Sequence, residues 1–472
     1  MKISIPSKKA FWILSYALFF LINILIYFFL DMKTDIITDF NIFIKSWCAN
    51  IVFLISVYVI YQLENSKIGL ASIVLLIGFI FNFGQTAMWS IGIHTNNEIG
   101  TGNIYGAFHC PSNREIYISI SYSILCFIAL SFGMALTIFL KKKKIRKKDG
   151  MRECIYRVSE IVAIPVVPLT FLKIIMTINY SVKHGYAALY YSGFRIPIIF
   201  EFAERLFFPV LVGILIGSQY RRVKIVYAIF ALFMISYCFA GERGNWFYDL
   251  IILIWMHHRF YEKLDLKKML KLGLVAFFSL YILAAMVDIR GYGLANISID
   301  DIIEAFALGN NPVIRFLMEM GGSLSVTLMV MSFGENMFQF GNTFASSFLS
   351  SISSKVAELF GVHNVYLSNY LSQDLLGISY GAGFNFFAET YINGSYLYML
   401  LYGVIVAMFI SGSCDEDSNK FSFRIFIMCI VTPALCSNFR GESLATFKSI
   451  MQIGVLYPLT IWIVNKIFYY RR

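Results

Sequence analysis

The chain has 472 residues, of which 58% are apolar, 17% aromatic and only 14% charged. Because roughly a quarter of the residues in a soluble domain are charged, this composition excludes an ordinary soluble protein. The net charge of +11 does not indicate a nucleic-acid partner, because most of the 39 basic residues fall in short segments on one side of the apolar runs. We therefore predict an all-α polytopic integral membrane protein.

Long apolar runs predict about twelve transmembrane helices, each of about 17–25 residues in the usual case. The first run follows Lys2, Lys8 and Lys9 and has no small-residue cleavage site, so we interpret it as a retained span. The predicted spans begin near Ala10, Trp47, Ile68, Ile116, Ile161, Pro197, Val223, Trp246, Leu270, Ile392, Phe421 and Ile450.

A basic run at residues 141–148 sets the predicted orientation. Inner loops of membrane proteins collect Lys and Arg, so this run is expected on the cytoplasmic side, and alternation then places both termini there. The chain divides into nine spans within residues 1–288, one large outer loop over 289–391, and three spans within 392–472.

The outer loop of residues 289–391 is long enough to indicate a function. Within it, residues 301–308 and 312–331 have helical patterning with apolar faces, and we expect these amphipathic helices to lie along the membrane surface. The span from Trp246 to Met256 is short, which indicates a broken or late helix entry where backbone lines a protein cavity.

Three arginines, Arg243, Arg290 and Arg440, are each followed by glycine and fall at the predicted outer boundary. Guanidinium presents a planar fork of donors that matches phosphate, and an adjacent glycine lets backbone approach a ligand closely. A lipid diphosphate would place its headgroup at this depth. The alternative is that each arginine snorkels or pairs with a nearby acid such as Glu242 or Glu442.

The sixth predicted span carries Glu201, Glu204 and Arg205 in its outer third. Glu201 and Arg205 are four residues apart on one helical face, so they can pair. Ionisable groups at membrane depth indicate a functional site by default, and a structural ion pair between helices is the alternative.

The segment from Gly381 to Ser395, GAGFNFFAETYINGS, leads from the outer loop into a span. Glu389 is expected at the helix entry near the outer face, with Asn385 and Asn393 close by. A carboxylate there can act as general base on a sugar hydroxyl. The alternative is an acid favoured by the helix dipole.

Metal chemistry has little support in the sequence. Asp300 and Asp301 form an acidic pair, but metal-dependent lipid-linked transferases usually place such a pair in the first outer loop. The eight cysteines show no metal-binding spacing, and Cys48 and Cys110 can either pair near the outer face or pack as apolar residues. We expect no metal and no cofactor.

At these segments the chain resembles the O-antigen polysaccharide polymerases of Wzy type. The resemblance is supported by about twelve spans with one dominant outer loop. It rests on three motifs, GERGNW at 241–246, MEMGGSL at 318–324 and GAGFNFFAETYINGS at 381–395, and Arg440 in a fourth motif, NFRGES at 438–443, supports it. An Arg-x10-Gly pattern found in some members is absent after Arg195, Arg243, Arg290 and Arg315.

The resemblance implies a reaction at the periplasmic face of a bacterial inner membrane. A growing glycan on undecaprenyl diphosphate is transferred onto a new lipid-linked repeat, and arginines neutralise the leaving diphosphate. Arg243, Arg290 and Arg440 are the expected diphosphate contacts, with Glu389 as first candidate for the base and Glu242 as second. Further expected substrate-binding residues are Arg195, Glu201, Arg205, Asn245, Arg315, Asn385 and Glu442.

Expected partners are the lipid-linked donor and acceptor, a chain-length regulator and a flippase, with no nucleic acid. The alternative enzyme is an O-antigen ligase, which moves finished polymer onto lipid A core. The alternative from another class is a lipid-linked oligosaccharide flippase, which needs polar groups along a path through many spans. Here the polar groups concentrate in the outer half, which favours an enzyme; a sensor or scaffold protein is a further alternative.

Overall fold

The prediction of an all-α protein is confirmed. The structure is a computed structural model, 84% helical, and no strand occurs among the residues it describes. It falls into two compact units: the first comprises Met1–Ile145, Leu317–Glu416 and Leu435–Lys448, and the second comprises the rest. The described residues are 7–64, 69–95, 98–99, 110–141, 151–184, 195–240, 245–265, 267–268, 270–275, 311–362, 365–378, 383–410 and 422–468.

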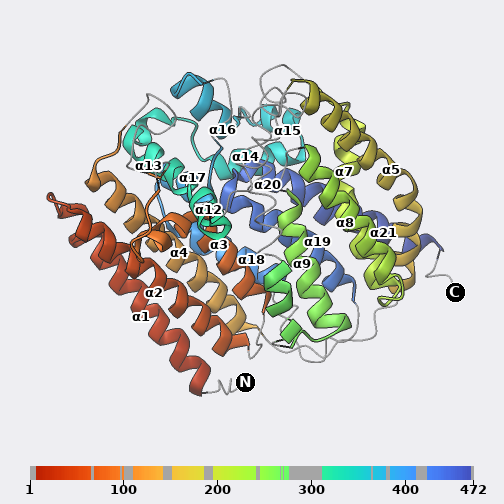
Figure 1. Cartoon of the computed structure of the whole chain (residues 1–472), viewed down its shortest axis with the longest axis horizontal. Coiled ribbons are helices and arrows are strands. Elements are labelled where there is room, and N and C mark those ends of the chain that lie inside the picture. Colours follow the sequence, from red (N-terminus) through yellow and green to blue (C-terminus); the bar gives the residue numbers. More distant parts are fainter. Residues whose placement is uncertain are drawn as a thin grey trace. The chain divides into compact units, whose positions relative to one another are not determined.

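The first unit is built around four long N-terminal helices and the short helices of the predicted outer loop (Figure 1). A 3-10 turn at Asn438–Arg440 separates α20 from the preceding helix. Its helices are α1 (Ser7–Phe29), α2 (Asp39–Glu64), α3 (Leu70–Trp89), α4 (Asn113–Leu140), α13 (Leu324–Phe333), α14 (Thr343–Ile352), α15 (Ser354–Leu359), α16 (Leu367–Asn369), α17 (Phe386–Ile392), α18 (Leu397–Ile410) and α20 (Ser443–Ser449).

The second unit packs α5 along α7 and α8. Two helices, α12 (Pro312–Gly321) and α19 (Phe423–Ser437), begin in this unit and end in the first. The described part of α9 has 12 residues and continues as a π-helical turn, His257–Tyr261; residues 241–244, where the broken entry is predicted, lie outside the described residues. The unit's own helices are α5 (Arg152–His184), α7 (Ile198–Gly217), α8 (Val223–Ala240), α9 (Asn245–Met256) and α21 (Tyr457–Phe468), the last preceded by a π-helical segment, Ile450–Leu456.

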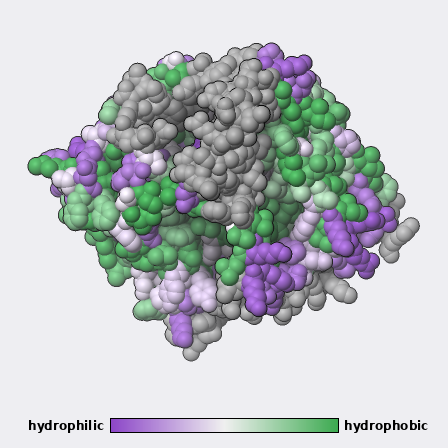
Figure 2. Space-filling model, in the orientation of Figure 1, coloured by the Kyte–Doolittle hydropathy of each residue, from purple (hydrophilic) through white to green (hydrophobic). Residues whose placement is uncertain are grey.

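Eight helices in the described part of the chain are long and apolar enough to cross a membrane, and two shorter apolar helices accompany them. Apolar side chains cover much of the described surface seen in Figure 2, as expected for a surface that faces lipid. The chain is therefore a multi-pass membrane protein. The count of twelve spans stays a prediction, since residues 276–310 lie outside the described residues.

Helix α4 is the centre of the first unit and packs against α1, α2, α13 and α18. It begins at a capping box, in which Ser112 and Glu115 satisfy each other's backbone N–H groups. After this start most of its side chains are buried, including serines. The hydroxyl of Tyr16 on α1 shares hydrogen bonds with Ser56 on α2 and Ser131 on α4, which ties the three helices together.

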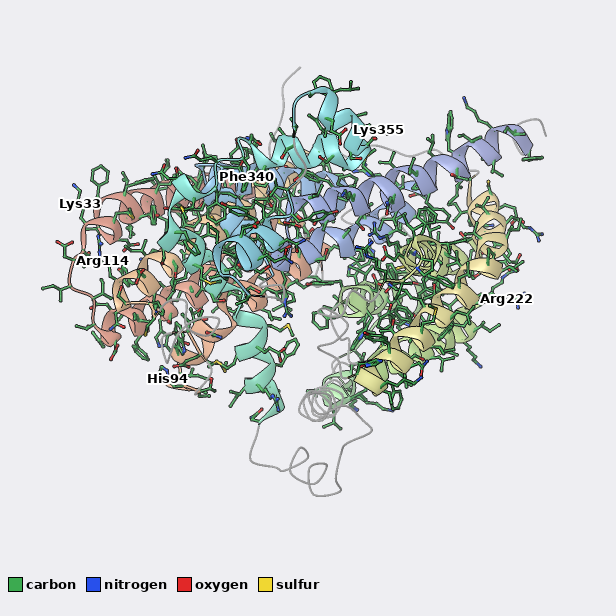
Figure 3. All side chains as sticks on the ribbon, turned by 90° about the horizontal axis from the view of Figure 1, so that it is seen from above. Lys33, His94, Arg114, Arg222, Phe340 and Lys355 are labelled. Carbon is green, nitrogen blue, oxygen red and sulfur yellow. The ribbon has the colours of Figure 1, made fainter. Side chains whose placement is uncertain are left out.

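Polar contacts also join the ends of α1, α2 and α4 near Arg114, which is labelled in Figure 3. The Arg114 guanidinium lies 3.4 Å from the carbonyl oxygen of Thr34. Below it, buried Lys45 donates to Asp31 at 2.5 Å, and the Tyr117 hydroxyl donates to the same carboxylate at 2.8 Å. Through Asp31 these contacts join the segment after α1 to α2 and α4.

Helix α13 differs from the sequence expectation. Residues 312–331 are helical apart from a turn at Gly322, as predicted, but residues 324–330 are buried in the first unit against α4 and α17. They do not form an apolar face open to a membrane surface, so the expectation of a surface-lying helix is wrong here. Apolar patterning could not separate these two placements, because the partner helices lie far away in sequence.

Two glycines explain how this segment reaches the core. A Cβ on Gly321 would lie 2.2 Å from the backbone nitrogen of Gln85, and one on Gly84 would lie 2.3 Å from the carbonyl oxygen of Leu317. The backbone of the MEMGGSL motif therefore touches the backbone of α3. The Gln85 side chain completes the contact by donating to the carbonyl oxygen of Met318 at 2.9 Å.

Candidate functional site

The helix α17 carries three polar residues at four-residue spacing, which places Asn385, Glu389 and Asn393 on one side. Asn385 is the N-cap, because its Oδ1 accepts from the backbone nitrogen of Ala388 at 2.7 Å. Its Nδ2 donates to the carbonyl oxygen of Ser323 at 2.6 Å and to Thr327 Oγ1 at 2.9 Å. Asn385 thus fastens the start of α17 to α13 and is itself fully buried.

Glu389, one turn further on, is fully buried and accepts three hydrogen bonds. Thr343 Oγ1 on α14 donates to Oε1 at 2.9 Å. Ser443 donates twice, from its backbone nitrogen to Oε2 at 2.8 Å and from Oγ to Oε1 at 2.5 Å. Burial raises the pKa of Glu389 from 4.5 to about 7, and the bonds from Ser443 and Thr343 partly oppose this rise.

Asn393 completes the link between α17 and α14. Its Nδ2 donates to Thr343 Oγ1 at 2.8 Å and to the carbonyl oxygen of Glu389 at 2.7 Å, while its Oδ1 accepts from the backbone nitrogen of Thr343 at 2.9 Å. The Ser443 hydroxyl also lies 2.9 Å from Ser347 Oγ on α14. Side chains from α14, α17 and α20 therefore form one hydrogen-bonded cluster.

The 3-10 turn Asn438–Arg440 runs beside this cluster. Phe439 is buried against the rings of Phe387 and Tyr402, at centroid distances of 6.5 and 6.3 Å. The next residue, Arg440, is exposed. Its guanidinium lies 3.3 Å from Met320 Sδ and 6.0 Å from the centroid of the Phe81 ring.

Arg440 has no carboxylate within ion-pair distance in the described part of the chain. The carboxylate of Glu442, two residues away, is bonded to another segment: its Oε2 accepts from the backbone nitrogen of Ser368 at 3.1 Å. Burial raises the pKa of Glu442. The alternative that Arg440 pairs with Glu442 is therefore excluded by this geometry.

In the second unit, Glu204 forms a structural ion pair. It accepts from Lys173 on α5 and from the hydroxyl of Tyr237 on α8, so one carboxylate joins three helices. The pair considered for Glu201 and Arg205 does not form, because Arg205 donates to Gln452 at 2.7 Å and Glu201 is exposed. Glu204 therefore holds helices together, and Arg205 links α7 to the π-helical segment Ile450–Leu456.

For the other predicted site residues the structure gives only a position or an exposure, or does not describe them. Arg195 is exposed just before α7, Arg315 is half-buried on α12, and Asn245 begins α9. Glu242, Arg243 and Arg290 lie outside the described residues, as do Asp300 and Asp301. Cys48 and Cys110 are exposed free thiols, so the pairing considered for them is absent.

The sequence did not indicate four residues of the site. Thr343, Ser347 and Ser443 belong to the hydrogen-bonded cluster, and Phe81 contacts Arg440. Serine, threonine and phenylalanine are common in apolar spans and carry no distinctive spacing. A partial signal existed only for Ser443, which ends the NFRGES motif. The others are joined to the motifs by tertiary contacts alone.

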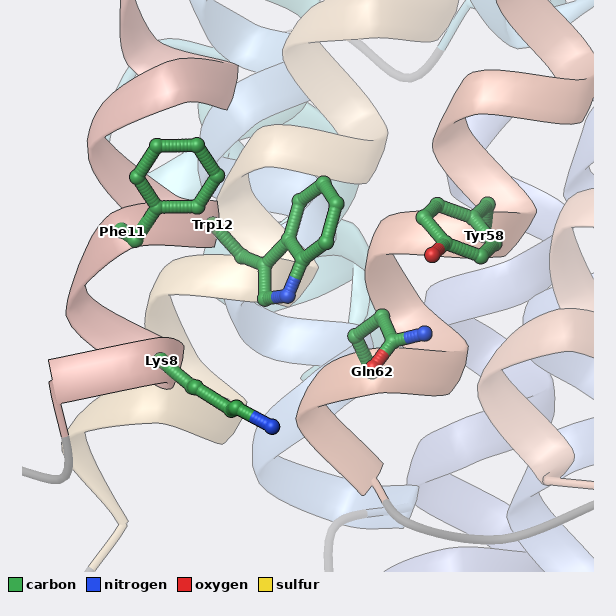
Figure 4. A pocket seen from close by; sticks show the side chains of 5 residues that line it. All are labelled: Lys8, Phe11, Trp12, Tyr58 and Gln62. Atoms are coloured by element: carbon green, nitrogen blue, oxygen red, sulfur yellow. The ribbon is translucent and has the colours of Figure 1, made fainter.

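A groove lies apart from this cluster, on α1 and α2 (Figure 4), with a volume of about 510 Å³. It sits at the start of α1, whereas Tyr27, near the other end, packs on Tyr122 at a centroid distance of 6.0 Å. Tyr122 in turn contacts α17 through Thr390 at 3.0 Å. The groove is therefore not part of the cluster; it is lined by Lys8, Phe11, Trp12, Tyr58 and Gln62.

Three of the four motifs noted in the sequence meet in the first unit. MEMGGSL supplies Met320 beside Arg440, the segment before α18 supplies Glu389, and NFRGES supplies Arg440 and Ser443. The family model for O-antigen polysaccharide polymerase Wzy matches residues 11–472, nearly the whole chain. The chain belongs to this family. No curated protein and no solved structure matches it. Membership in the Wzy family makes the chain an O-antigen polymerase of lipopolysaccharide biosynthesis.

The buried Glu389 predicts a pH-dependent stability of this Wzy polymerase. A carboxyl whose pKa rises from 4.5 unfolded to about 7 folded binds its proton more tightly in the native state. Its contribution is fully present below about 4.5 and is lost as the pH rises through about 7. The melting temperature of purified protein in detergent should fall across this window. Glu389→Gln should flatten that part of the profile, and an unchanged slope would contradict the assignment.

Proposed function

We propose that this Wzy polymerase joins oligosaccharide repeat units carried on undecaprenyl diphosphate, at the periplasmic face of the bacterial inner membrane. In the reaction, the bond from the donor glycan's anomeric carbon to diphosphate breaks. A new bond forms from that carbon to a hydroxyl of the acceptor repeat. The acceptor hydroxyl gives up its proton, and undecaprenyl diphosphate leaves with the bonding electron pair.

The observation that carries this proposal is the exposed guanidinium of Arg440. It has no carboxylate partner in the described residues, and it contacts Met320 and the ring of Phe81. A guanidinium in this setting can bind a diphosphate bidentately and offset the charge that develops on the leaving group. Arg243 and Arg290 are proposed as further diphosphate contacts, and Arg195, Arg205 and Arg315 as substrate-binding residues, all on sequence grounds.

The position of the cluster along α4 supports a periplasmic site. Tyr122, which contacts Thr390, lies about 14 Å from the start of α4 and about 27 Å from its end, at 1.5 Å per residue. The lysine-rich run 141–148 follows that far end and is expected on the cytoplasmic side. The cluster thus lies nearer the opposite end, which we assign to the periplasm.

Accessibility argues against Glu389 as the base. Both oxygens of Glu389 are occupied by protein donors and the side chain is fully buried, so a sugar hydroxyl cannot reach it in this conformation. We therefore propose the second candidate, Glu242, as the base, and Asn245 as a substrate contact, both on sequence grounds. Donor, acceptor, a chain-length regulator and a flippase are the proposed partners.

A strain lacking this chain tests the proposal. We expect its lipopolysaccharide gel to show core bearing a single repeat and no ladder, and a plasmid copy to restore the ladder. If core carried no repeat while polymer accumulated on undecaprenyl, the chain would be a ligase. Single repeats trapped on the inner face of the membrane would instead identify a flippase.

A further inference from the structure

We infer that Glu389 is a positioning residue. It fixes the turn Asn438–Arg440, called here the Arg440 turn, through hydrogen bonds and does not touch substrate. This inference rests on the proposed function, because it takes Arg440 as a contact to the diphosphate. Glu389 and Arg440 belong to segments far apart in the chain, and Glu389 reaches the turn through Ser443, 54 residues away in sequence.

Helix α17 contacts the chain both before and after Arg440. On one side, the Phe387 ring packs edge-to-face on Phe439, the residue immediately before Arg440. On the other side, Glu389 accepts from the backbone nitrogen and the hydroxyl of Ser443, three residues after Arg440. The backbone that carries Arg440 is therefore fixed on both sides by a single helix.

The same helix is itself fixed. Asn385 fastens it to α13, and Asn393 fastens it to α14. Glu442 adds a third restraint on the turn, since its carboxylate accepts from the backbone nitrogen of Ser368. A turn restrained in this way can keep an arginine in one orientation without a counter-ion, and orientation of a charged group is a large part of its catalytic effect.

A carboxylate suits this position because one group accepts from a backbone N–H and from two hydroxyls on different helices. A glutamine has the same shape: its carbonyl oxygen can accept from the backbone nitrogen of Ser443, and its amide N–H groups can donate to the hydroxyl oxygens of Thr343 and Ser443 once the hydroxyl hydrogens rotate away. Glutamine cannot act as a base. The exchange of Glu389 for glutamine therefore separates the positioning role from the catalytic one.

The experiment uses the full chain purified in detergent and measures its affinity for undecaprenyl diphosphate together with its polymerisation rate across pH. We expect Glu389→Gln to stay within about twofold of wild type in both, as a retained hydrogen-bond acceptor allows. Glu389→Ala should weaken diphosphate binding by roughly tenfold or more, because the arginine is displaced. Ser443→Ala, which keeps the backbone bond, should fall between them.

A double substitution tests whether Glu389 acts through Arg440. In the Arg440→Ala background, Glu389→Ala should cause no further loss of diphosphate affinity. The matched control is Glu358→Ala on α15, which removes an exposed carboxylate of the same unit and should leave both measurements unchanged. Melting temperatures of all variants identify those that no longer fold.

Three results would overturn the inference. Loss of the polymerisation rate in a folded Glu389→Gln protein would show that Glu389 is a catalytic base. Additive losses in the double variant would show a purely structural role. Unchanged diphosphate affinity in Arg440→Ala alone would remove the contact on which both the proposed function and this inference depend, whereas a dead Glu389→Gln leaves that contact standing.

Discussion

Replacing Arg440 by alanine is expected to lower the polymerisation rate by roughly 10²–10³-fold, the loss typical of removing one donor to a developing negative charge. The guanidinium is exposed and has no carboxylate partner in the described part of the chain, so its removal leaves no buried charge unpaired. Stability should therefore change little. The rate is measured on membranes supplied with lipid-linked repeats, and the ladder length in a complemented deletion strain reports the same loss in cells.

Two further variants sharpen this result. Arg440→Lys keeps the positive charge but loses the planar fork, so it should recover only part of the rate. Arg114→Ala removes another exposed arginine of the first unit, one that contacts only the loop after α1 in the described structure, and it should retain the wild-type rate. If Arg440→Ala and Arg114→Ala gave equal rates, Arg440 would not bind the diphosphate.

The sequence predicted the helical class well, because apolar runs of membrane length admit few other structures. It failed at α13, whose residues 324–330 are buried between helices instead of lying on a surface. An apolar stretch of that length satisfies either environment. What decided the placement was the close backbone approach of Gly84 and Gly321, and no local pattern in either segment reports that the other lies opposite.

The candidate site was partly predictable for a related reason. Arg440 stood out because arginine beside glycine is unexpected at an outer boundary, and its exposure agrees with a binding role. Glu389 stood out as a lone acid at a helix entry, and it does lie in the first turn of α17. Its environment was not predicted, because the donors Thr343 and Ser443 come from segments 46 and 54 residues away. Local spacing finds the charged residue, and tertiary contacts decide what it does.

The crossing of α4 and α18 gives the largest expected effect on stability. A Cβ on Gly133 would lie 2.1 Å from the carbonyl oxygen of Leu400, and one on Gly403 would lie 2.0 Å from that of Leu130. Backbone atoms cannot rotate away as a flexible side chain can. Either alanine variant must therefore push the helices apart, and we expect each to lower the free energy of unfolding by roughly 1–3 kcal/mol.

The crossing also bears on function, since α18 follows α17 after only four residues and the two helices pack together. Gly403→Ala should thus lower the melting temperature in detergent and weaken polymerisation as well. The matched control is Gly273→Ala, where a Cβ would meet no atom of the described residues within 4 Å. There alanine should be neutral or stabilising by up to about 1 kcal/mol, because it favours helix more than glycine does. A Gly403→Ala protein that melted like the Gly273→Ala control would mean that α4 and α18 do not cross at backbone contact, and the anchoring of α17 would then need another source.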